Sequence, residues 1–448
     1  MYKLKQDLLA QNRFYLFKSE QQDYLYDAFS QNIFPIETVV SNFLFSDSKN
    51  TFSENEKKII STTLEYFSKW KGNISYAIPT ETHISINISN KCNLNCVYCY
   101  RDKTNKTEAS LDKLYEIIDY ADKYYKTNNN EIVFTLDMSA ESFLDKEKIK
   151  SLYKKICEYK EHQKMRIWFM SNGTKLSDDF INLIKEIPVN PFWISLDGPE
   201  NVHNTNRMYY NNNGSYNDVI KNIKKLQEND ISIKISCVIT NEYPYPEKIF
   251  NHIKQLHVSA IQMCPVRNGC KSSLSVKSLK ILKESYSLLF EQLFFEIINN
   301  DFSSVVLLKD DFVLQTIFIF FNRCRQSARC TWGQEVVIDS KGNIYPCIYV
   351  SNDKKYLLGN ISEKKNANEL LKQISVNERI KCKSCWARFL CGGTCHYNAI
   401  ISKNSEFETD DIECELKLFL IKESIRMIIK LKQNNYDFNS FAKLLKDI

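Results

Sequence analysis

The chain has 448 residues, of which 25% are charged and 43% are apolar, and its formal net charge is +6. A prior of about 150 residues per domain predicts two to four domains and a large core. Only 10 glycines and 9 prolines occur, which excludes collagen-like, low-complexity and disordered chains. The small basic excess requires neither nucleic acid nor an anionic membrane as a partner.

No segment resembles a membrane span or a secretion signal. The longest apolar run, Val313 to Phe321, is interrupted by Gln315 and Thr316 and is far shorter than the roughly 18 residues that cross a bilayer. The first residues lack an apolar signal core, so we expect a cytoplasmic protein. In a reducing compartment the 15 cysteines are expected to be metal ligands or reactive thiols before disulfides.

Residues 1–75 are expected to form a small first domain. Aromatic segments at Phe14 to Phe17 and Tyr24 to Tyr26 flank a polar turn, which predicts a hairpin. A short helix is expected over Ile36 to Phe45. Ser53 can cap a second helix, whose apolar face is expected to carry Ile59, Ile60, Leu64, Tyr66 and Phe67.

From residue 82 the chain alternates short apolar runs with helical segments, as repeated βα units around a parallel sheet do. Six units allow an incomplete βα barrel or a doubly wound sheet, and both place the chemistry at the carboxyl ends of the strands. The expected strands are His83 to Ile88, Ile132 to Leu136, Arg166 to Met170, Phe192 to Leu196, Ile231 to Val238 and Ala260 to Cys264. The expected helices are Leu111 to Tyr125, Glu147 to Tyr159, Ser177 to Ile187 and Tyr216 to Gln227.

The remaining chain divides into three expected parts. Residues 271–323 form a helical bridge, and residues 324–414 form a Cys-rich region that includes a hairpin over Val336 to Tyr345 with an Asp-Ser-Lys-Gly turn. Residues 415–448 contain an apolar helix over Glu415 to Lys432.

The first cysteine set follows directly after the first barrel-type strand. Cys92, Cys96 and Cys99 have the spacing C-x3-C-x2-C, with Tyr98 before the third cysteine. Three thiolates on one loop can hold three irons of a [4Fe-4S] cluster and leave the fourth iron open for a non-protein ligand. A structural zinc site is the alternative, but such zinc takes four protein ligands and no fourth Cys or His is near in sequence.

This motif resembles the signature of the radical SAM enzyme superfamily. The resemblance implies that Cys92, Cys96 and Cys99 bind the cluster and that its open iron binds S-adenosylmethionine. Reduction by an external donor of the flavodoxin or ferredoxin type would then give a 5′-deoxyadenosyl radical, which abstracts hydrogen from an unactivated C–H bond. The implied fold is α/β, with a partial (β/α)6 TIM barrel over residues 82–270.

Other strand ends resemble the cofactor site of this superfamily. Ser139-Ala140-Glu141-Ser142 stands where the family usually has Gly-Gly-Glu-Pro, so the acid remains although both glycines are replaced. Ser171-Asn172-Gly173-Thr174 resembles the family's Thr-Asn-Gly-Thr, and Ser195-Leu196-Asp197-Gly198-Pro199, with His203 and Arg207 downstream, resembles the peptide-modifying branch. The cofactor contacts that the resemblance implies are Tyr98, Glu141, Asn172, Ser195 and Arg207.

Eight further cysteines in the C-terminal region make two sets of four. From spacing alone, zinc ribbons are the alternative. The pattern is similar to the SPASM extension of radical SAM enzymes, which houses two auxiliary [4Fe-4S] clusters and would bring the total to three. Because both auxiliary clusters would be fully ligated, we expect them to carry electrons. The resemblance assigns Cys324, Cys330, Cys347 and Cys395 to the first, and Cys382, Cys385, Cys391 and Cys414 to the second.

The resemblance favours a maturase of ribosomally made peptides, such as the thioether-forming sactipeptide and ranthipeptide synthases. Residues 1–75 look like the winged-helix element that binds the leader of a precursor peptide. The expected reaction is an intramolecular cross-link, either a thioether or a carbon–carbon bond. No nucleic acid or membrane partner is expected.

Two alternatives remain. The anaerobic sulfatase-maturating enzymes, which form formylglycine, carry an Asp as general base directly after the Cys that matches Cys347, whereas this chain has Ile348, which cannot accept a proton. A non-catalytic zinc-binding regulator is the alternative from another class. Four cysteines stay unassigned; Cys237 and Cys264 are expected in the core, Cys270 is loop-like and could touch substrate, and the fourth is Cys157.

Overall fold

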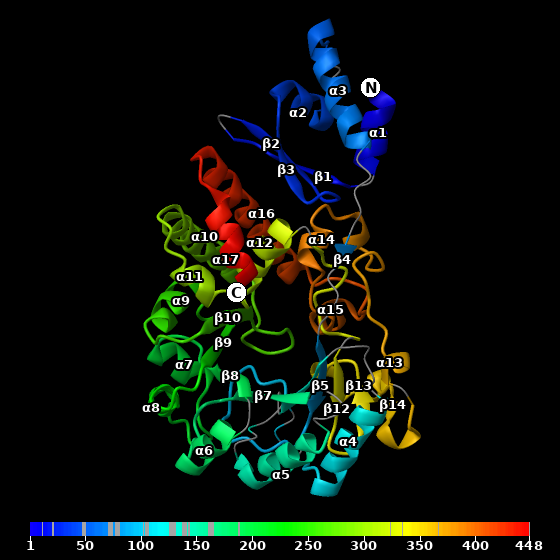
Figure 1. The fold of residues 1–448 in the computed structure, drawn as a ribbon. Coiled ribbons are helices and arrows are strands. Elements are labelled where there is room, and N and C mark those ends of the chain that lie inside the picture. The colour runs from blue at the N-terminus through cyan, green and yellow to red at the C-terminus, as the bar shows by residue number, and fades with distance from the viewer. Residues whose placement is uncertain are drawn as a thin grey trace.

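The computed structural model describes most of the chain (Figure 1). The described residues are 1–10, 12–19, 22–46, 51–69, 75–76, 81–101, 103, 107–124, 131–136, 141, 144–159, 165–186, 189–322, 324–333, 335–365 and 367–447. Ser139, Ala140 and Ser142, which the resemblance placed around the cofactor, lie outside them. No helix in these ranges is long and apolar enough to cross a membrane.

The N-terminal unit is a three-stranded antiparallel sheet with helices on one face, and it stands at one end of the molecule (Figure 1). The predicted hairpin and both helices are present, while an additional helix precedes them. Ile60, Leu64 and Phe67 are buried as expected, but Tyr66 is 57% exposed. The elements are α1 (Tyr2–Ala10), β1 (Phe14–Phe17), β2 (Asp23–Asp27), β3 (Asn32–Ile36), α2 (Thr38–Phe45) and α3 (Glu54–Lys69).

The two faces of this sheet pack on different partners. Leu25 lies on the face that packs against α1, α2 and α3. Phe17, Tyr24 and Tyr26 lie on the other face and share an apolar cluster with Ile425 and other residues of the C-terminal helix. The N-terminal unit is therefore fixed to the C-terminal region by a shared core.

The next part is a parallel sheet in which six strands follow one another in chain order, from β5 to β10. This consecutive order is that of a partial (β/α)6 barrel and excludes a doubly wound sheet. The strands are β5 (Glu81–Ile86), β6 (Glu131–Leu136), β7 (Met165–Ser171), β8 (Val189–Ser195), β9 (Ile233–Ile239) and β10 (Ala260–Pro265). The helices are α4 (Leu111–Tyr124), α5 (Lys146–Cys157), α6 (Asp178–Glu186), α7 (Glu200–Asn206), α8 (Tyr216–Gln227) and α9 (Pro246–Lys254).

The two faces of the parallel sheet differ in chemistry. One face carries Phe134, Phe169 and other apolar side chains that are fully buried against the surrounding helices. The register places Ser195 beside Ser236 on the opposite face, and Ser236 beside Gln262. This alternation of β-branched or aromatic residues with polar ones positions a polar interior inside an apolar shell.

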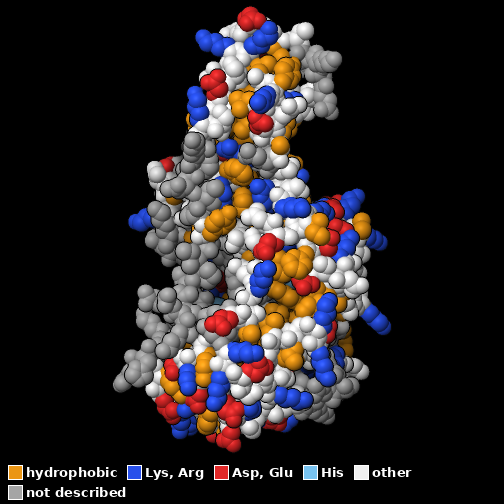
Figure 2. All heavy atoms as spheres, turned by 90° about the vertical axis from the view of Figure 1, so that its right-hand side faces the viewer, with side chains coloured by type: hydrophobic (Ala, Val, Ile, Leu, Met, Phe, Trp, Pro, Cys, Tyr) orange, Lys and Arg blue, Asp and Glu red, His pale blue; other side chains and the backbone are white. Residues whose placement is uncertain are grey.

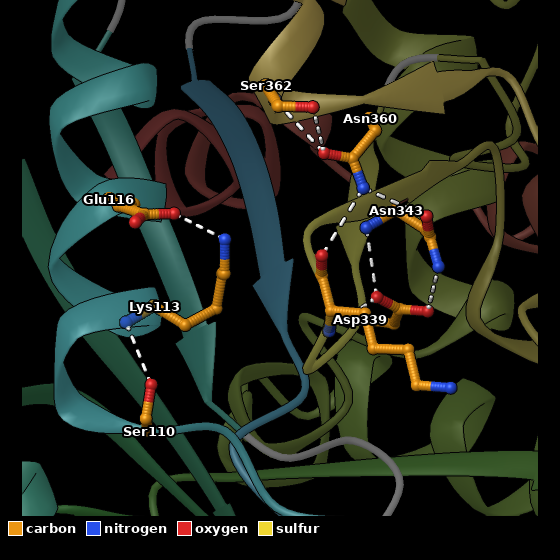
Figure 3. Close-up of polar contacts among 8 residues, drawn as sticks. Ser110, Lys113, Glu116, Asp339, Asn343, Asn360 and Ser362 are labelled. Atoms are coloured by element: carbon orange, nitrogen blue, oxygen red, sulfur yellow. Dashed lines mark hydrogen bonds and ion pairs between the residues drawn. The ribbon is translucent and has the colours of Figure 1, made fainter.

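The C-terminal region extends the barrel sheet. Strand β12 (Val336–Ile338) pairs in parallel with β5, and β13 (Asn343–Tyr345) and β14 (Gly359–Asn360) continue in antiparallel order. The predicted Asp-Ser-Lys-Gly turn joins β12 to β13, with Gly342 at a φ of +83°. Asp339 accepts hydrogen bonds from the backbone and side-chain nitrogens of Asn343 (Figure 3).

The other elements of this region are mainly helical. Strand β11 (Cys324–Arg325) pairs with β4 (Ser75–Tyr76), which leads from the N-terminal unit to the barrel. The helix α16 starts at Asp411, where Asp410 caps it, so the expected boundary at residue 415 falls inside a helix. The helices are α10 (Val276–Ile298), α11 (Ser303–Leu307), α12 (Phe312–Asn322), α13 (Ala367–Leu370), α14 (Arg388–Cys391), α15 (His396–Lys403), α16 (Asp411–Gln433) and α17 (Phe438–Asp447), with short 3-10 turns at Ile348–Val350, Lys354–Tyr356, Ile361–Glu363 and Cys382–Ser384.

Candidate active site

The loop that carries the first cysteine set begins where β5 ends. The backbone N–H of Asn95 donates to the carbonyl of Met208 at 2.7 Å, and that of Val97 donates to Asn206 at 3.0 Å. The N–H of Cys99 donates to Cys96 at 3.3 Å. The loop is thus held against the segment after β8, at the carboxyl end of the barrel strands.

The three thiols of this loop lie within electrostatic range of one another. Burial raises the pKa of Cys96 to about 12, while the charge of Arg207 opposes that rise and the neighbouring Cys92 and Cys99 add to it. Arg101 lies beside both Cys92 and Cys99, and its guanidinium also donates to the carbonyl of Asn90. Without a metal, Cys92 and Cys96 stay protonated at neutral pH, so metal binding would release protons.

A zinc ion and a [4Fe-4S] cluster require different distances between the three thiols. A tetrahedral zinc, with Zn–S bonds of about 2.3 Å, draws its thiolates to roughly 4 Å from one another. In the described residues no three His, Cys, Asp or Glu side chains converge in that way on a single ion. Three thiols within electrostatic range but not converged fit a larger group that takes each thiolate on a separate iron.

Glu141 connects the ends of three strands. Its carboxylate is buried and accepts a hydrogen bond from the Ser171 hydroxyl at 2.9 Å and from the Asn172 backbone N–H at 2.6 Å. Its own N–H donates to the carbonyl of Lys91, one residue before the first cysteine. The predicted cofactor acid is therefore fixed beside Cys92, whose pKa its charge helps to raise.

Asn172 lies directly against the cysteine loop. Its side-chain nitrogen donates to the Asn93 side chain at 2.9 Å and lies 3.8 Å from the sulfur of Cys92. Its side-chain oxygen accepts from the N–H and hydroxyl of Thr174. Gly173, at a φ of +74°, makes this tight turn possible.

Tyr98 and Arg207 meet at a third residue, Asp197, which is fully buried. The Asp197 carboxylate accepts from the Tyr98 hydroxyl at 2.6 Å and from the Val238 N–H at 3.0 Å, and forms an ion pair with the Arg207 guanidinium at 3.1 Å. The guanidinium also lies over the Tyr98 ring, 5.3 Å from its centre. Burial opposes the charged form of Arg207, but the charge of Asp197 raises its pKa, so Arg207 stays charged.

His203 completes this network as a neutral side chain. Its Nδ1 accepts from the Asp197 N–H at 3.3 Å, and its Nε2 lies 3.0 Å from the Ser215 hydroxyl. Burial lowers the pKa of His203 to about 4. Ser195, the remaining predicted cofactor contact, is half-buried on the polar face of the sheet at the end of β8.

Three of the four cysteines of the first C-terminal set lie close to one another. Cys330 and Cys395 share a side-chain hydrogen bond, which lowers the pKa of Cys330 and raises that of Cys395. Cys347 is close to both and burial raises its pKa to about 12. Cys324 lies half-buried on β11, where burial raises its pKa.

All members of the second set lie within electrostatic range of Cys382. Burial, followed by the charge of Cys391, raises the pKa of Cys382 to about 12, and Cys385 and Cys414 add to the same effect. The N–H of Cys385 donates to the carbonyl of Cys382 at 2.9 Å. Cys414 lies in the first turn of α16, so the helix carries the last predicted ligand to the other three.

Three tyrosines between the cysteine sets were missed by sequence reasoning. The rings of Tyr100 and Tyr349 lie 4.3 Å apart, and those of Tyr349 and Tyr397 stack at 5.1 Å. Tyr100 follows Cys99, and the other two each stand two residues after a cysteine of the first C-terminal set. The repeated two-residue offset from Cys to Tyr is the sequence signal that could have identified Tyr349 and Tyr397.

The four unassigned cysteines lie in different environments. Cys237 is fully buried in the barrel core, as expected, whereas Cys264 is half-buried on the polar face of the sheet. Cys157 is half-buried at the end of α5. The sulfur of Cys270 lies 3.6 Å from the Ser273 hydroxyl, in the loop after β10.

Residues 86–252 match the family model of the radical SAM superfamily. The chain is a radical SAM enzyme. This family implies a [4Fe-4S] cluster and S-adenosylmethionine, which Cys92, Cys96 and Cys99, and the side chains at the adjoining strand ends, would hold. The match favours a radical SAM enzyme over the zinc-binding regulator.

Curated relatives cover most of the chain. A Cysteine-type anaerobic sulfatase-maturating enzyme from Clostridium novyi (strain NT) is 25% identical over 352 residues, 73% of this chain and 90% of the relative. A Serine-type anaerobic sulfatase-maturating enzyme from Bacteroides thetaiotaomicron is 24% identical over 68% of this chain and 80% of the relative.

Two solved structures show the same fold as this radical SAM enzyme. That of anSMEcpe with bound AdoMet and the Kp18Cys peptide has a TM-score of 0.65 and 20% identity, and covers 79% of this chain and 99% of its own. That of Streptococcus suis SuiB bound to the precursor peptide SuiA has a TM-score of 0.51 and 14% identity, and covers 90% of this chain and 98% of its own.

Proposed function

We propose that this radical SAM enzyme matures a ribosomally made precursor peptide by forming an intramolecular thioether or carbon–carbon cross-link. When bound, the cluster and S-adenosylmethionine supply the 5′-deoxyadenosyl radical that takes one hydrogen atom from the peptide. The cross-link forms when a second proton and electron also leave the peptide. The chain's own residues hold the loop, the cofactor and the substrate in place.

The observation that carries this proposal is the side chain after Cys347. Ile348 is 6% exposed and packs in an apolar cluster with Val337 and Tyr345. A formylglycine-forming enzyme of the kind outlined above would need a base at this position. A buried branched alkyl side chain cannot accept a proton, so Ile348 cannot act as this base.

The two C-terminal cysteine sets support a role in electron transfer. If each set holds a [4Fe-4S] cluster, the chain carries three, and the auxiliary clusters can accept the electron that leaves the peptide. That electron would pass to an external donor-acceptor protein of the flavodoxin or ferredoxin type. The N-terminal unit, whose winged-helix-like role in leader binding is part of this proposal, would hold the precursor while the barrel acts on it.

Formation of formylglycine is the second candidate. The two curated relatives described above are sulfatase-maturating enzymes, and one of them covers 73% of this chain. That reaction converts a Cys or Ser of a protein substrate to an aldehyde. It would require a base other than residue 348.

Mass spectrometry of a candidate precursor co-expressed with this enzyme separates the two reactions. A cross-link removes two hydrogen atoms and keeps every sulfur, and fragmentation fails between the joined residues. Formylglycine from Cys loses the sulfur, and formylglycine from Ser gives an aldehyde that reacts with hydrazides. The control is the triple variant Cys92→Ala, Cys96→Ala, Cys99→Ala, in which the precursor should stay unmodified. An aldehyde in the product would overturn the cross-linking proposal.

A further inference from the structure

A half-buried acid, Glu335, stands directly before β12, the strand that joins the C-terminal region to the barrel sheet. Its backbone N–H donates to the carbonyl of Thr331 at 2.8 Å. Thr331 follows Cys330 of the first C-terminal set. The backbone that carries Glu335 is therefore fixed to this cysteine set.

The Glu335 side chain lies on the inner face of the barrel sheet. Val337, which is two residues later and therefore on the same side of the strand, pairs with Ser85 of β5. The Ser85 hydroxyl donates to the Glu335 carboxylate. Ile84 and Ile86, on either side of Ser85, belong to the apolar core on the opposite face. The carboxylate is thus held at the polar interior of the barrel.

The carboxylate lies between the first cysteine set and the first C-terminal set. Val337 belongs to the apolar cluster that Tyr100 and Cys347 contact. Burial raises the pKa of Tyr100 and also that of Cys347, and the charge of Glu335 adds to both rises. Tyr100 follows Cys99 of the first set, whereas Cys347 belongs to the first C-terminal set. A substrate that reaches from one set toward the other would pass beside Glu335.

The Glu335 carboxylate has room for a further donor. Among the described residues its hydrogen-bond partner is the Ser85 hydroxyl, and no Lys, Arg or His pairs with it. The buried acid Glu413 differs, because it pairs with Lys417 at 3.1 Å and accepts from the Cys395 N–H at 3.0 Å. A carboxylate has about four acceptor positions, so Glu335 can still accept from a substrate.

We propose that Glu335 accepts the proton that leaves the precursor peptide when the cross-link forms. The inference rests on the proposed function and names the base that this reaction uses. For a thioether, one C–H and one S–H bond break and one C–S bond forms. The hydrogen atom passes to the 5′-deoxyadenosyl radical, the S–H proton to the Glu335 carboxylate, and the remaining electron to the external acceptor of the flavodoxin or ferredoxin type. In a carbon–carbon cross-link, the proton of the second carbon would pass to the same carboxylate.

The variant Glu335→Gln tests this role, because its amide oxygen can still accept from Ser85 but cannot take up a proton. The full enzyme is given a precursor made from deuterated amino acids. We expect the cross-link to form at least about 100-fold more slowly than in the wild type. The variant should still transfer deuterium from the peptide to 5′-deoxyadenosine, and should bind the fluorescein-labelled precursor as the wild type does. Cross-linking at the wild-type rate, or loss of deuterium transfer together with the cross-link, would overturn the proposal.

A second variant, Glu335→Asp, separates proton transfer from a merely structural role. It keeps a carboxylate but shortens the side chain by one methylene group. If Glu335 accepts the proton, the Asp variant should cross-link at least about tenfold faster than the Gln variant. If Glu335 only holds Ser85, the Gln variant should be the faster one, and the proposal fails. The matched control Glu116→Gln makes the same change on an exposed side chain of α4 and should cross-link as the wild type does.

Failure of the inference and failure of the proposed function give different results. If the wild type and Glu335→Gln cross-link the precursor equally fast, the inference fails while the proposed function stands. If the wild type gives an aldehyde, the proposed function fails. The order of the Asp and Gln variants then still decides whether Glu335 is the base, because formylglycine formation also requires one.

Discussion

Asp197 joins three parts of the site behind the cysteine loop. Its carboxylate joins Tyr98, Val238 and Arg207, which come from the loop, from β9 and from the segment after α7. Each of these parts contributes to the site, and the carboxylate is fully buried. We infer that Asp197 positions Tyr98 and Arg207 and itself contacts no substrate.

Replacing Asp197 by Asn should be strongly destabilising. The change leaves the buried Arg207 charge without its counter-ion, which costs about 3 kcal/mol of unfolding free energy. Urea unfolding followed by circular dichroism measures this. The control Asp218→Asn removes the exposed negative charge beside the Tyr209 hydroxyl and should cost less than about 1 kcal/mol. Equal midpoints for both variants would contradict this role of Asp197.

His203 should make stability depend on pH. Its pKa is lowered from 6.5 to about 4 by burial, so between these values the unfolded chain binds a proton that the folded chain does not. The stability due to neutral His203 is therefore complete above pH 6.5 and is lost as pH falls toward 4, by roughly 3 kcal/mol.

The measurement compares urea unfolding of the wild type and of His203→Gln from pH 8 to pH 4. The difference between the two free energies of unfolding should shrink as the pH falls, because only the wild type loses this contribution. A difference that is constant over the whole range would contradict a neutral, buried His203.

At the scale of elements, most of the barrel could be predicted from local pattern. Each of the six expected strands overlaps one of β5 to β10, and the helix over Tyr216–Gln227 has the predicted bounds. Alternation with period two and helical periodicity are local properties, so the sequence carries them directly. The pairing of β12 with β5 and of β11 with β4 joins segments about 250 residues apart, and no local pattern encodes it.

Gly392 joins the two C-terminal cysteine sets through backbone contact. It ends α14 directly after Cys391, at a φ of +66°, and its carbonyl accepts from the N–H of Arg329, the residue before Cys330. A Cβ at this position would lie 2.7 Å from the Arg329 Cβ and 2.8 Å from its backbone nitrogen. A close approach of two backbones therefore requires glycine here.

Gly392→Ala should cost at least about 2 kcal/mol, because strain in the left-handed region adds to the clash with Arg329. Iron bound per chain should fall with it, since both cysteine sets adjoin this contact. In the control Gly359→Ala the added Cβ would make ordinary van der Waals contacts, the nearest at 3.4 Å, and the position has no positive φ, so the change should cost less than about 1 kcal/mol. Thermal unfolding and iron analysis of the two variants measure these effects. An unchanged iron content in Gly392→Ala would contradict the role of this backbone contact.

At the scale of the whole molecule, the N-terminal unit is part of the same body as the C-terminal region. Trp386 follows Cys385 of the second set and contacts Tyr15, Phe17 and Tyr26 of the N-terminal sheet. The contact joins residues more than 350 positions apart, so the sequence predicted the two units but not their junction. On one face of the molecule, positive and negative side chains are interspersed (Figure 2).

The candidate site was predictable where spacing alone carries the information. The first cysteine set follows from its spacing, the two C-terminal sets were assigned by the resemblance, and Glu141 and Asn172 lie beside Cys92 in the structure. The contacts of Asp197 and the row of Tyr100, Tyr349 and Tyr397 depend on side chains that meet only after folding. Cys324 is an exception to the expected sets. It was grouped with Cys330, whereas the structure brings Cys330 together with Cys347 and Cys395 only.

We propose that the eleven thiols hold three [4Fe-4S] clusters and that only the first serves S-adenosylmethionine. Iron analysis with Mössbauer spectroscopy of the anaerobically purified chain tests it most directly. We expect about twelve irons per chain, and about eight in the variant Cys92→Ala, Cys96→Ala, Cys99→Ala, which should yield no 5′-deoxyadenosine with dithionite. Cys382→Ala with Cys385→Ala should also hold about eight, yet still release 5′-deoxyadenosine. A colourless protein that holds zinc, or a first-set variant that still cleaves S-adenosylmethionine, would contradict the account.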